Sequence, residues 1–321
     1  MSSHGIAALR EGLITEGQAA LFSHSGLSRG PHDNLRYLLS DLGLQALREK
    51  LITVEECAKI PDLEALMTPN GLVALRDKLI TPEQASYMYA YGGKGPYKNL
   101  RDLMSDCGIQ ALREKLITPE EAARIYDLAA LMTPNGLFAL RKGLITPDQA
   151  SEMYNRGVYP GPYPNLPVLL ENFGLQALSE NLITPEEAAR IKDFSYLMTH
   201  NGLVALRENL ITPEQASNIY SGGKCDGPFS NLRNLLTDFG LQSLRQKLIK
   251  PEDVIRARYF SVLVNKEYAQ VALENRLIDI SDLDYHTGSL GKLLGHELEY
   301  EIKKRVDEFK SKNKAYMTCK P

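Results

Sequence analysis

The chain has 321 residues, of which 43% are hydrophobic and 24% are charged, so it can bury a substantial core. It carries 37 Lys and Arg against 40 Asp and Glu, a formal net charge of −3 that argues against a protein holding nucleic acid by its phosphates. The four cysteines and six histidines are scattered without metal-ligand or nucleophile spacing, so no cofactor, metal site or catalytic residue is predicted.

At the N-terminus, Met1 to Gly5 contain no charged segment followed by an apolar run, so no secretory signal peptide is predicted. No later stretch approaches the roughly 18 apolar residues that a membrane-spanning helix needs. We therefore expect a soluble, cytoplasmic protein without a transmembrane segment.

A phrase of the form GLxALRxxLIT recurs along the chain. It begins at Gly5, Gly43, Gly71, Gly108, Gly136, Gly174, Gly202 and Gly240. A ninth, degenerate copy extends from Ala269 to Asp279. Because the spacings alternate near 38 and 28 residues, two copies form a super-repeat of about 66. This predicts an all-α helical-repeat solenoid over residues 1–285, with four super-repeats and a degenerate half.

Each copy predicts three short helices. In the copy at Gly136, apolar residues recur as one stripe from Leu137 to Ile145, and Thr146-Pro-Asp-Gln149 then gives a capped start to a second helix. A third short helix of the form LxxL(L/M) precedes the next phrase and ends in Thr-Pro-Asn or Ser-Asp, which can cap the helix that follows. Helices this short are not stable alone, so stacking on neighbours must hold them.

Two residues of the phrase support further predictions. Its glycine falls in the first turn of a helix, where Gly costs about 1 kcal/mol relative to Ala, so we predict that a neighbouring helix passes too close for a Cβ. An arginine recurs at Arg10, Arg48, Arg76, Arg113, Arg141, Arg207 and Arg245. Such a ladder could bind an acidic or phosphorylated partner; the favoured interpretation is pairing with nearby Glu or Asp within or between copies.

The longer copies contain about ten extra residues between helices. All four insertions end in Gly-Pro-(aromatic or His)-x-Asn-Leu, whose Asn is predicted to cap the next helix. In a regular stack, insertions at equivalent positions line up on one face, and Tyr and Arg are enriched at binding hot spots. The predicted partner-binding residues are Tyr91, Lys94, Tyr97, Arg156, Tyr159, Tyr163, Lys224 and Phe229. The alternative is that each aromatic residue packs under its own loop.

Residues 286–321 differ from the repeats. A Gly-punctuated linker leads to a charged amphipathic helix from Glu297 to Lys314, with Leu298, Ile302, Val306 and Phe309 on one side. We predict that this helix caps the C-terminal end of the stack.

Two families resemble this sequence. Leu79-Ile-Thr-Pro-Glu-Gln84 followed by Gly92-Gly-Lys94 resembles the repeats of transcription-activator-like effectors, which implies DNA binding. Those repeats are uniform, whereas these alternate in length. The repeated ALRxxLITPEQA also resembles repeats in secreted effectors of Legionella and its relatives, and the Glu-rich C-terminal helix is similar to the acidic patches near the C-terminus of proteins exported by that type IV system. This resemblance implies delivery into the host cytosol and a host protein as partner.

The sequence thus predicts a non-enzymatic protein–protein interaction scaffold with the insertions as its contact row. The alternatives are an enzyme or small-molecule binder whose site is assembled from distant residues, a nucleic-acid-binding repeat, and a structural spacer. The identity of the partner and the oligomeric state do not follow from the sequence.

Overall fold

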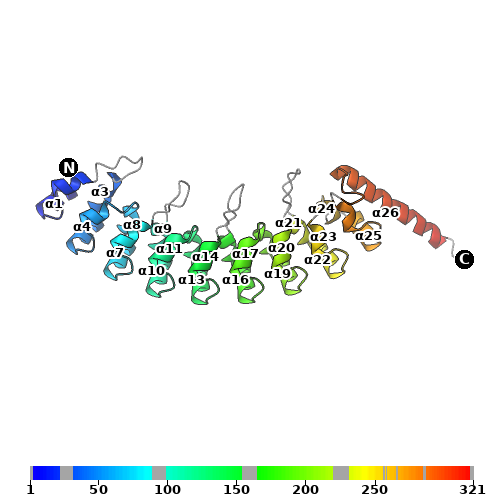
Figure 1. Ribbon diagram of the computed structural model, residues 1–321, viewed down its shortest axis with the longest axis horizontal. Coiled ribbons are helices and arrows are strands. Elements are labelled where there is room, and N and C mark those ends of the chain that lie inside the picture. Colours follow the sequence, from blue (N-terminus) through cyan, green and yellow to red (C-terminus); the bar gives the residue numbers. More distant parts are fainter. Residues whose placement is uncertain are drawn as a thin grey trace. The chain divides into compact units, whose positions relative to one another are not determined.

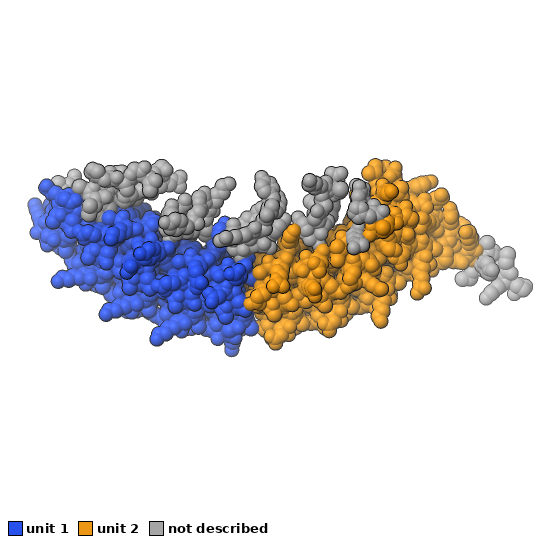
Figure 2. All heavy atoms as spheres, viewed as in Figure 1, with its two compact units in different colours: residues 1–158 blue, residues 159–321 orange. Residues whose placement is uncertain are grey.

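The structure is a computed structural model that describes residues 3–21, 32–88, 99–153, 165–219, 231–255, 257, 259–264, 267–284 and 287–318. Its contacts divide the chain into two compact units, Met1–Val158 and Tyr159–Pro321 (Figure 2). The described residues form helices and one isolated β-bridge, Ala257 with Asp284, but no strand. The prediction of an all-α fold is confirmed. The predicted boundary at residues 285 and 286 lies outside the described residues.

In the first unit, helices recur in threes (Figure 1). The first helices are α1 (Ser3–Arg10), α4 (Asp41–Arg48), α7 (Pro69–Arg76), α10 (Asp106–Arg113) and α13 (Pro134–Arg141). The second helices are α2 (Glu16–Leu21), α5 (Val54–Cys57), α8 (Pro82–Tyr87), α11 (Pro119–Arg124) and α14 (Pro147–Glu152). The third helices are α3 (His32–Leu38), α6 (Leu63–Leu66), α9 (Asn99–Leu103) and α12 (Leu128–Leu131). Each packs against the corresponding helix of the next copy, so each kind of helix forms a row.

The second unit follows the same order. It begins with a third helix, α15 (Asn165–Leu169). The later copies comprise α16 (Asn172–Ser179), α17 (Pro185–Arg190), α18 (Phe194–Leu197), α19 (His200–Arg207), α20 (Pro213–Asn218), α21 (Asn231–Leu235), α22 (Asp238–Arg245), α23 (Pro251–Val254) and α24 (Phe260–Val264). The degenerate ninth copy retains a first helix, α25 (Glu267–Glu274), and a 3-10 turn, η1 (Ile280–Leu283). Corresponding helices again pack in rows, such as α15, α18, α21 and α24.

The glycine of the phrase lies where the first helix of a copy nearly touches the helix that precedes it in the chain. A Cβ built on Gly136 would lie 2.1 Å from the carbonyl oxygen of Leu131, and one on Gly71 would lie 2.0 Å from that of Leu66. The predicted close approach is confirmed, and the neighbour is the third helix of the preceding copy, five residues back in sequence. The turn between them is closed by Thr68, whose hydroxyl accepts a hydrogen bond from the Gly71 N–H at 3.0 Å.

The first helices end in a shared turn that the sequence prediction missed. In the copy of α7, Leu79 N–H donates to Ala74 O at 2.8 Å and Lys78 N–H donates to Leu75 O at 3.2 Å, the pair of bonds of a Schellman motif. The residue at the position of Lys78, called C′, needs a positive φ in this motif, and Gly adopts a positive φ without strain. The residues at this position are Gly12, Lys50, Lys78, Lys115, Gly143, Asn181, Asn209, Lys247 and Arg276.

The second helices begin as predicted. At α8 the Thr81 hydroxyl accepts from the Gln84 N–H at 3.1 Å, and the Gln84 side chain accepts from the Thr81 N–H at 2.8 Å. This reciprocal capping box satisfies two amides that the helix itself leaves free. The same box is found at Thr53, Thr118, Thr146, Thr184 and Thr212.

The chain closes with α26 (Gly295–Thr318), which packs against α24 and α25. Leu298, Ile302 and Val306 are buried on its inner side, whereas Phe309 is only half-buried. The predicted capping helix is therefore present, and it covers the last copy with its first three turns. Among the described residues, no helix is both long enough and apolar enough to cross a membrane.

Candidate functional site

All eight residues predicted to bind a partner lie outside the described residues. Tyr91, Lys94 and Tyr97 belong to residues 89–98, and Arg156, Tyr159 and Tyr163 belong to residues 154–164. Lys224 and Phe229 belong to residues 220–230. Their role stays a prediction. The described helices before and after each insertion show which positions of the repeat it connects.

In every long copy the insertion joins the second helix to the third. In the first unit the helices that precede insertions are α2, α8 and α14, and they belong to one packed row in which α5 and α11 alternate with them. Helices α8, α11 and α14 of this row are labelled in Figure 1. The insertions of this unit therefore leave from equivalent positions of alternate copies, as the repeat spacing predicts.

The Asn that ends each insertion has a role that the sequence prediction did not include. Asn99 is the first residue of α9 and is buried, and its side-chain oxygen, which would accept a capping bond, has no hydrogen-bond partner among the described residues. It donates to the carbonyl oxygens of Ala122 and Ile125 in the next copy, both at 2.9 Å. The same pair of bonds is made by Asn34, Asn165 and Asn231. The sequence prediction missed this role because the two acceptors lie 23 and 26 residues away in sequence. Each insertion thus ends on a buried amide that ties its copy to the following one.

The arginine ladder is engaged within the protein. Arg76 donates to Glu49 through Nε at 2.6 Å and Nη2 at 2.7 Å, and Glu49 directly follows the arginine of the preceding copy. Equivalent pairs join Arg48 to Glu11, Arg113 to Asp77, Arg141 to Glu114, Arg207 to Glu180 and Arg245 to Glu208. Pairing between copies is thus confirmed for these six arginines.

These pairs shift the titration of their carboxylates. The hydrogen bond from Arg76, followed by one from Gln45, lowers the pKa of Glu49 to about 2. Hydrogen bonds from arginine likewise lower the pKa of Glu11, Glu114, Glu180 and Glu208. At neutral pH both partners are ionised, so the ladder offers little free cationic surface to an acidic ligand.

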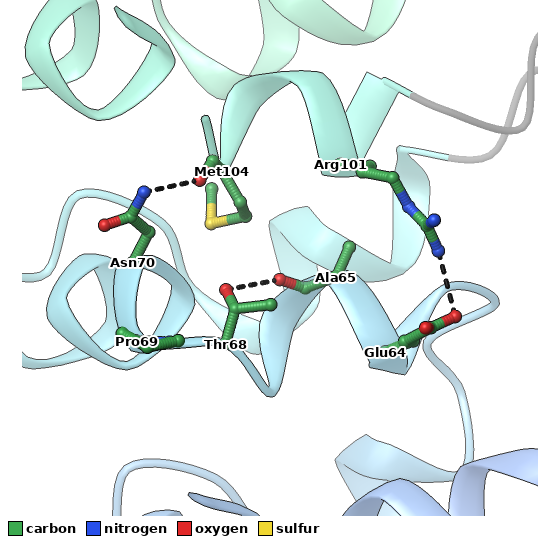
Figure 3. Close-up of a pocket in the computed structure, with 7 residues that line it drawn as sticks. All are labelled: Glu64, Ala65, Thr68, Pro69, Asn70, Arg101 and Met104. Carbon is green, nitrogen blue, oxygen red and sulfur yellow. Dashed lines mark hydrogen bonds and ion pairs between the residues drawn. The ribbon is translucent and has the colours of Figure 1, made fainter. Parts of the chain in front are cut away.

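A hollow of about 410 Å³ lies at a junction between copies of the first unit (Figure 3). It is lined by Glu64, Ala65, Thr68, Pro69, Asn70, Arg101 and Met104. Arg101 donates to Glu64 at 2.9 Å and lies 3.5 Å from Asp62, and these two carboxylates raise its pKa above the ordinary value. Asn70 donates to Met104 O at 3.0 Å and to Asp106 at 2.9 Å. The hollow has an apolar floor and a charged rim.

The sequence prediction passed over this hollow because its residues come from three helices and from no shared motif. It also passed over Tyr87, the last residue of α8, which is 70% exposed immediately before an insertion. A single alanine or tyrosine, such as Ala65 or Tyr87, does not indicate a binding surface in the sequence, because only the fold shows its position.

Little in the described residues indicates chemistry. No group of three His, Cys, Asp or Glu side chains in the described part of the chain is placed to hold a metal ion. Cys57 is buried, and burial raises the pKa of its thiol to about 12, so it is protonated at neutral pH and a poor nucleophile.

The chain was compared with known proteins in three ways. No model of a protein family, no curated protein and no solved structure gave a significant match.

Proposed function

We propose that this protein is a non-enzymatic scaffold that binds another protein through its insertions. The observation that carries the proposal is the position of the insertions. Those of the first unit leave from α2, α8 and α14, which lie in one row, and the alternate short copies act as spacers between them. Extended arrays of equivalent loops are the usual contact surfaces of repeat proteins.

The difference in residue types between the helices and the insertions supports the same proposal. Gly, Arg and Asn of the helical segments hold the copies together, as Gly71, Arg76 and Asn99 show by their contacts inside the protein. The insertions contain Tyr and Arg, residue types that are enriched at binding hot spots, at Tyr91, Tyr97, Arg156, Tyr159 and Tyr163.

As its setting we propose that of a bacterial effector, translocated into the host cytosol, with a host protein as partner. This part of the proposal rests on the resemblance of ALRxxLITPEQA to repeats of secreted Legionella effectors.

The proposal is tested by capture from a eukaryotic lysate. The wild-type chain is compared with a variant in which Tyr91, Tyr97, Tyr159, Tyr163 and Phe229 are all alanine, after circular dichroism shows equal helicity. A protein held by the wild type and lost from the variant is the expected result. Equal capture would place the binding site on the helices instead. Capture of nothing by either chain would refute the contact row and favour the enzyme or spacer alternatives.

A further inference from the structure

The hollow of the first unit has a counterpart in the second unit, at the same place in the repeat. Helix α6 corresponds to α18 and helix α9 to α21, so that Ala65 corresponds to Tyr196 and Arg101 to Arg233. Glu64 corresponds to Ser195. The two places thus share an arginine from the later copy and differ in what lies beneath it.

In the second unit an aromatic ring occupies this place. The guanidinium carbon of Arg233 lies 5.5 Å from the centroid of the Tyr196 ring, within the range of a cation–π contact. The tyrosine is half-buried there. The repeat geometry therefore accommodates an aromatic ring under the arginine without disturbing the packing of α18 against α21.

In the first unit the same place has only a methyl group, and the hollow of about 410 Å³ is found there. Ala65 and Met104 form its floor and are 3% and 5% exposed. A thioether and a methyl group favour contact with an aromatic ring. The Arg101 guanidinium forms its ion pairs with Glu64 and Asp62 at its edge, as Figure 3 shows for Glu64. A planar guanidinium paired at its edge can still stack through its face.

The polar groups of the hollow select among aromatic residues. The Thr68 hydroxyl donates to Ala65 O and accepts from the Gly71 N–H, and the Asn70 amide has two acceptors. The Glu64 oxygen Oε2 accepts a hydrogen bond from Arg101. The hydrogen bonds among the described residues include none to the other oxygen, Oε1. A phenol hydroxyl could donate to this oxygen, which favours tyrosine over phenylalanine.

We propose that this hollow is a binding site for a tyrosine side chain presented by a peptide segment of the partner protein. The ring lies on Ala65 and Met104 with the guanidinium of Arg101 against its face, as Arg233 lies against Tyr196, and the hydroxyl donates to Glu64. The inference rests on the proposed function, to which it adds one specific contact on the helical framework.

The test uses N-acetyl-tyrosinamide as the probe and the full chain labelled at its methionine methyl groups, with the Met104 signal assigned from Met104→Leu. Titration of the wild type is expected to shift the Met104 signal. Ala65→Tyr supplies the ring internally and should abolish the shift. Arg101→Gln should weaken binding about two- to fivefold, which corresponds to a cation–π contact of about 0.5–1 kcal/mol.

A reciprocal variant keeps the test decisive if Ala65→Tyr folds poorly. Tyr196→Ala opens the equivalent place in the second unit and should add a second binding site for the same probe. No shift of Met104 in the wild type and no added site in Tyr196→Ala would overturn the proposal. Binding that appears only after Tyr91 and Tyr97 are changed to alanine would overturn it too, because the chain itself would then fill the hollow. Neither result bears on capture of a partner by the insertions, so the two proposals can fail separately.

Discussion

At the scale of single residues, one position of the repeated phrase is mostly occupied by residue types that do not suit its backbone conformation. The C′ residue of each first helix needs a positive φ, and only Gly12 and Gly143 are glycines there. A left-handed conformation costs an L-residue about 1–2 kcal/mol, whereas glycine adopts it freely. The lysines at this position are therefore a source of strain that the Schellman bonds offset.

Replacing one of these lysines should stabilise the protein. Lys78 has a φ of 55°, and its side chain is exposed. We expect Lys78→Gly to raise stability by about 0.5–1 kcal/mol, after allowance for the greater freedom of glycine in the unfolded chain. Thermal unfolding should show a rise in melting temperature of about 1–2 °C. The control is Gly143→Ala, at a φ of 64°, which should lower the melting temperature; a rise there would contradict the account.

The ion pairs between copies predict a specific dependence on pH. The pKa of Glu49 is lowered to about 2 in the folded protein and lies near the ordinary value of 4.5 when the chain is unfolded. Its stabilising effect is therefore complete above about pH 4.5 and is lost as the pH falls from there towards 2. Wild type and Glu49→Gln should accordingly differ in melting temperature at pH 7 and converge at pH 2. A difference that stays constant across this range would show that the ion pair with Arg76 does not form in solution.

At the scale of elements, the first helix of each copy depends on one glycine more than on its helix propensity. Between α12 and α13 there is no room for a methyl group, because the Cβ of an alanine at 136 would lie 2.1 Å from a backbone carbonyl oxygen. Gly17 in α2 provides a contrast. It is also helical, but among the described residues a Cβ there would have only the Thr15 hydroxyl within 4 Å, at 3.9 Å.

The same substitution should therefore have opposite effects at these two glycines. Gly136→Ala must displace backbone and should cost about 1–3 kcal/mol or more. Gly17→Ala should stabilise α2 by about 0.5–1 kcal/mol, since glycine is a poor helix former. Urea unfolding of the two variants beside the wild type measures both. Equal effects of the two changes would mean that the close approach of α12 and α13 does not constrain the protein.

Comparison of elements also shows what the sequence could predict. The capping boxes, the repeated Gly and the pairing of Arg76 all follow from short patterns whose physical cause is local or repeats at each copy. The role of Asn99 does not, because its two acceptors lie in the next copy and only the packed structure brings them together. Lys78 was missed for a different reason, since lysine gives no signal for a positive φ.

At the scale of the whole molecule, long and short copies use the same contacts between helices. In the first unit, α5 packs against α8 and α8 against α11, although an insertion follows only α8. The short copies join the corresponding positions with one residue, as Tyr126 joins Ile125 to Asp127 where residues 89–98 join Met88 to Asn99. The helices of the short copies thus stack without an insertion, as the proposed function requires.

The most direct test of this account removes the insertions. In one variant, the segments 23–33, 89–98, 154–164 and 220–230 are each replaced by one residue, such as the Tyr found at position 126 of a short copy. Helicity and melting temperature are measured by circular dichroism, and capture from eukaryotic lysate is compared with that of the wild type. The account predicts a helical, cooperatively unfolding protein that no longer captures the partner. Retained capture, or a chain that cannot fold without its insertions, would contradict it.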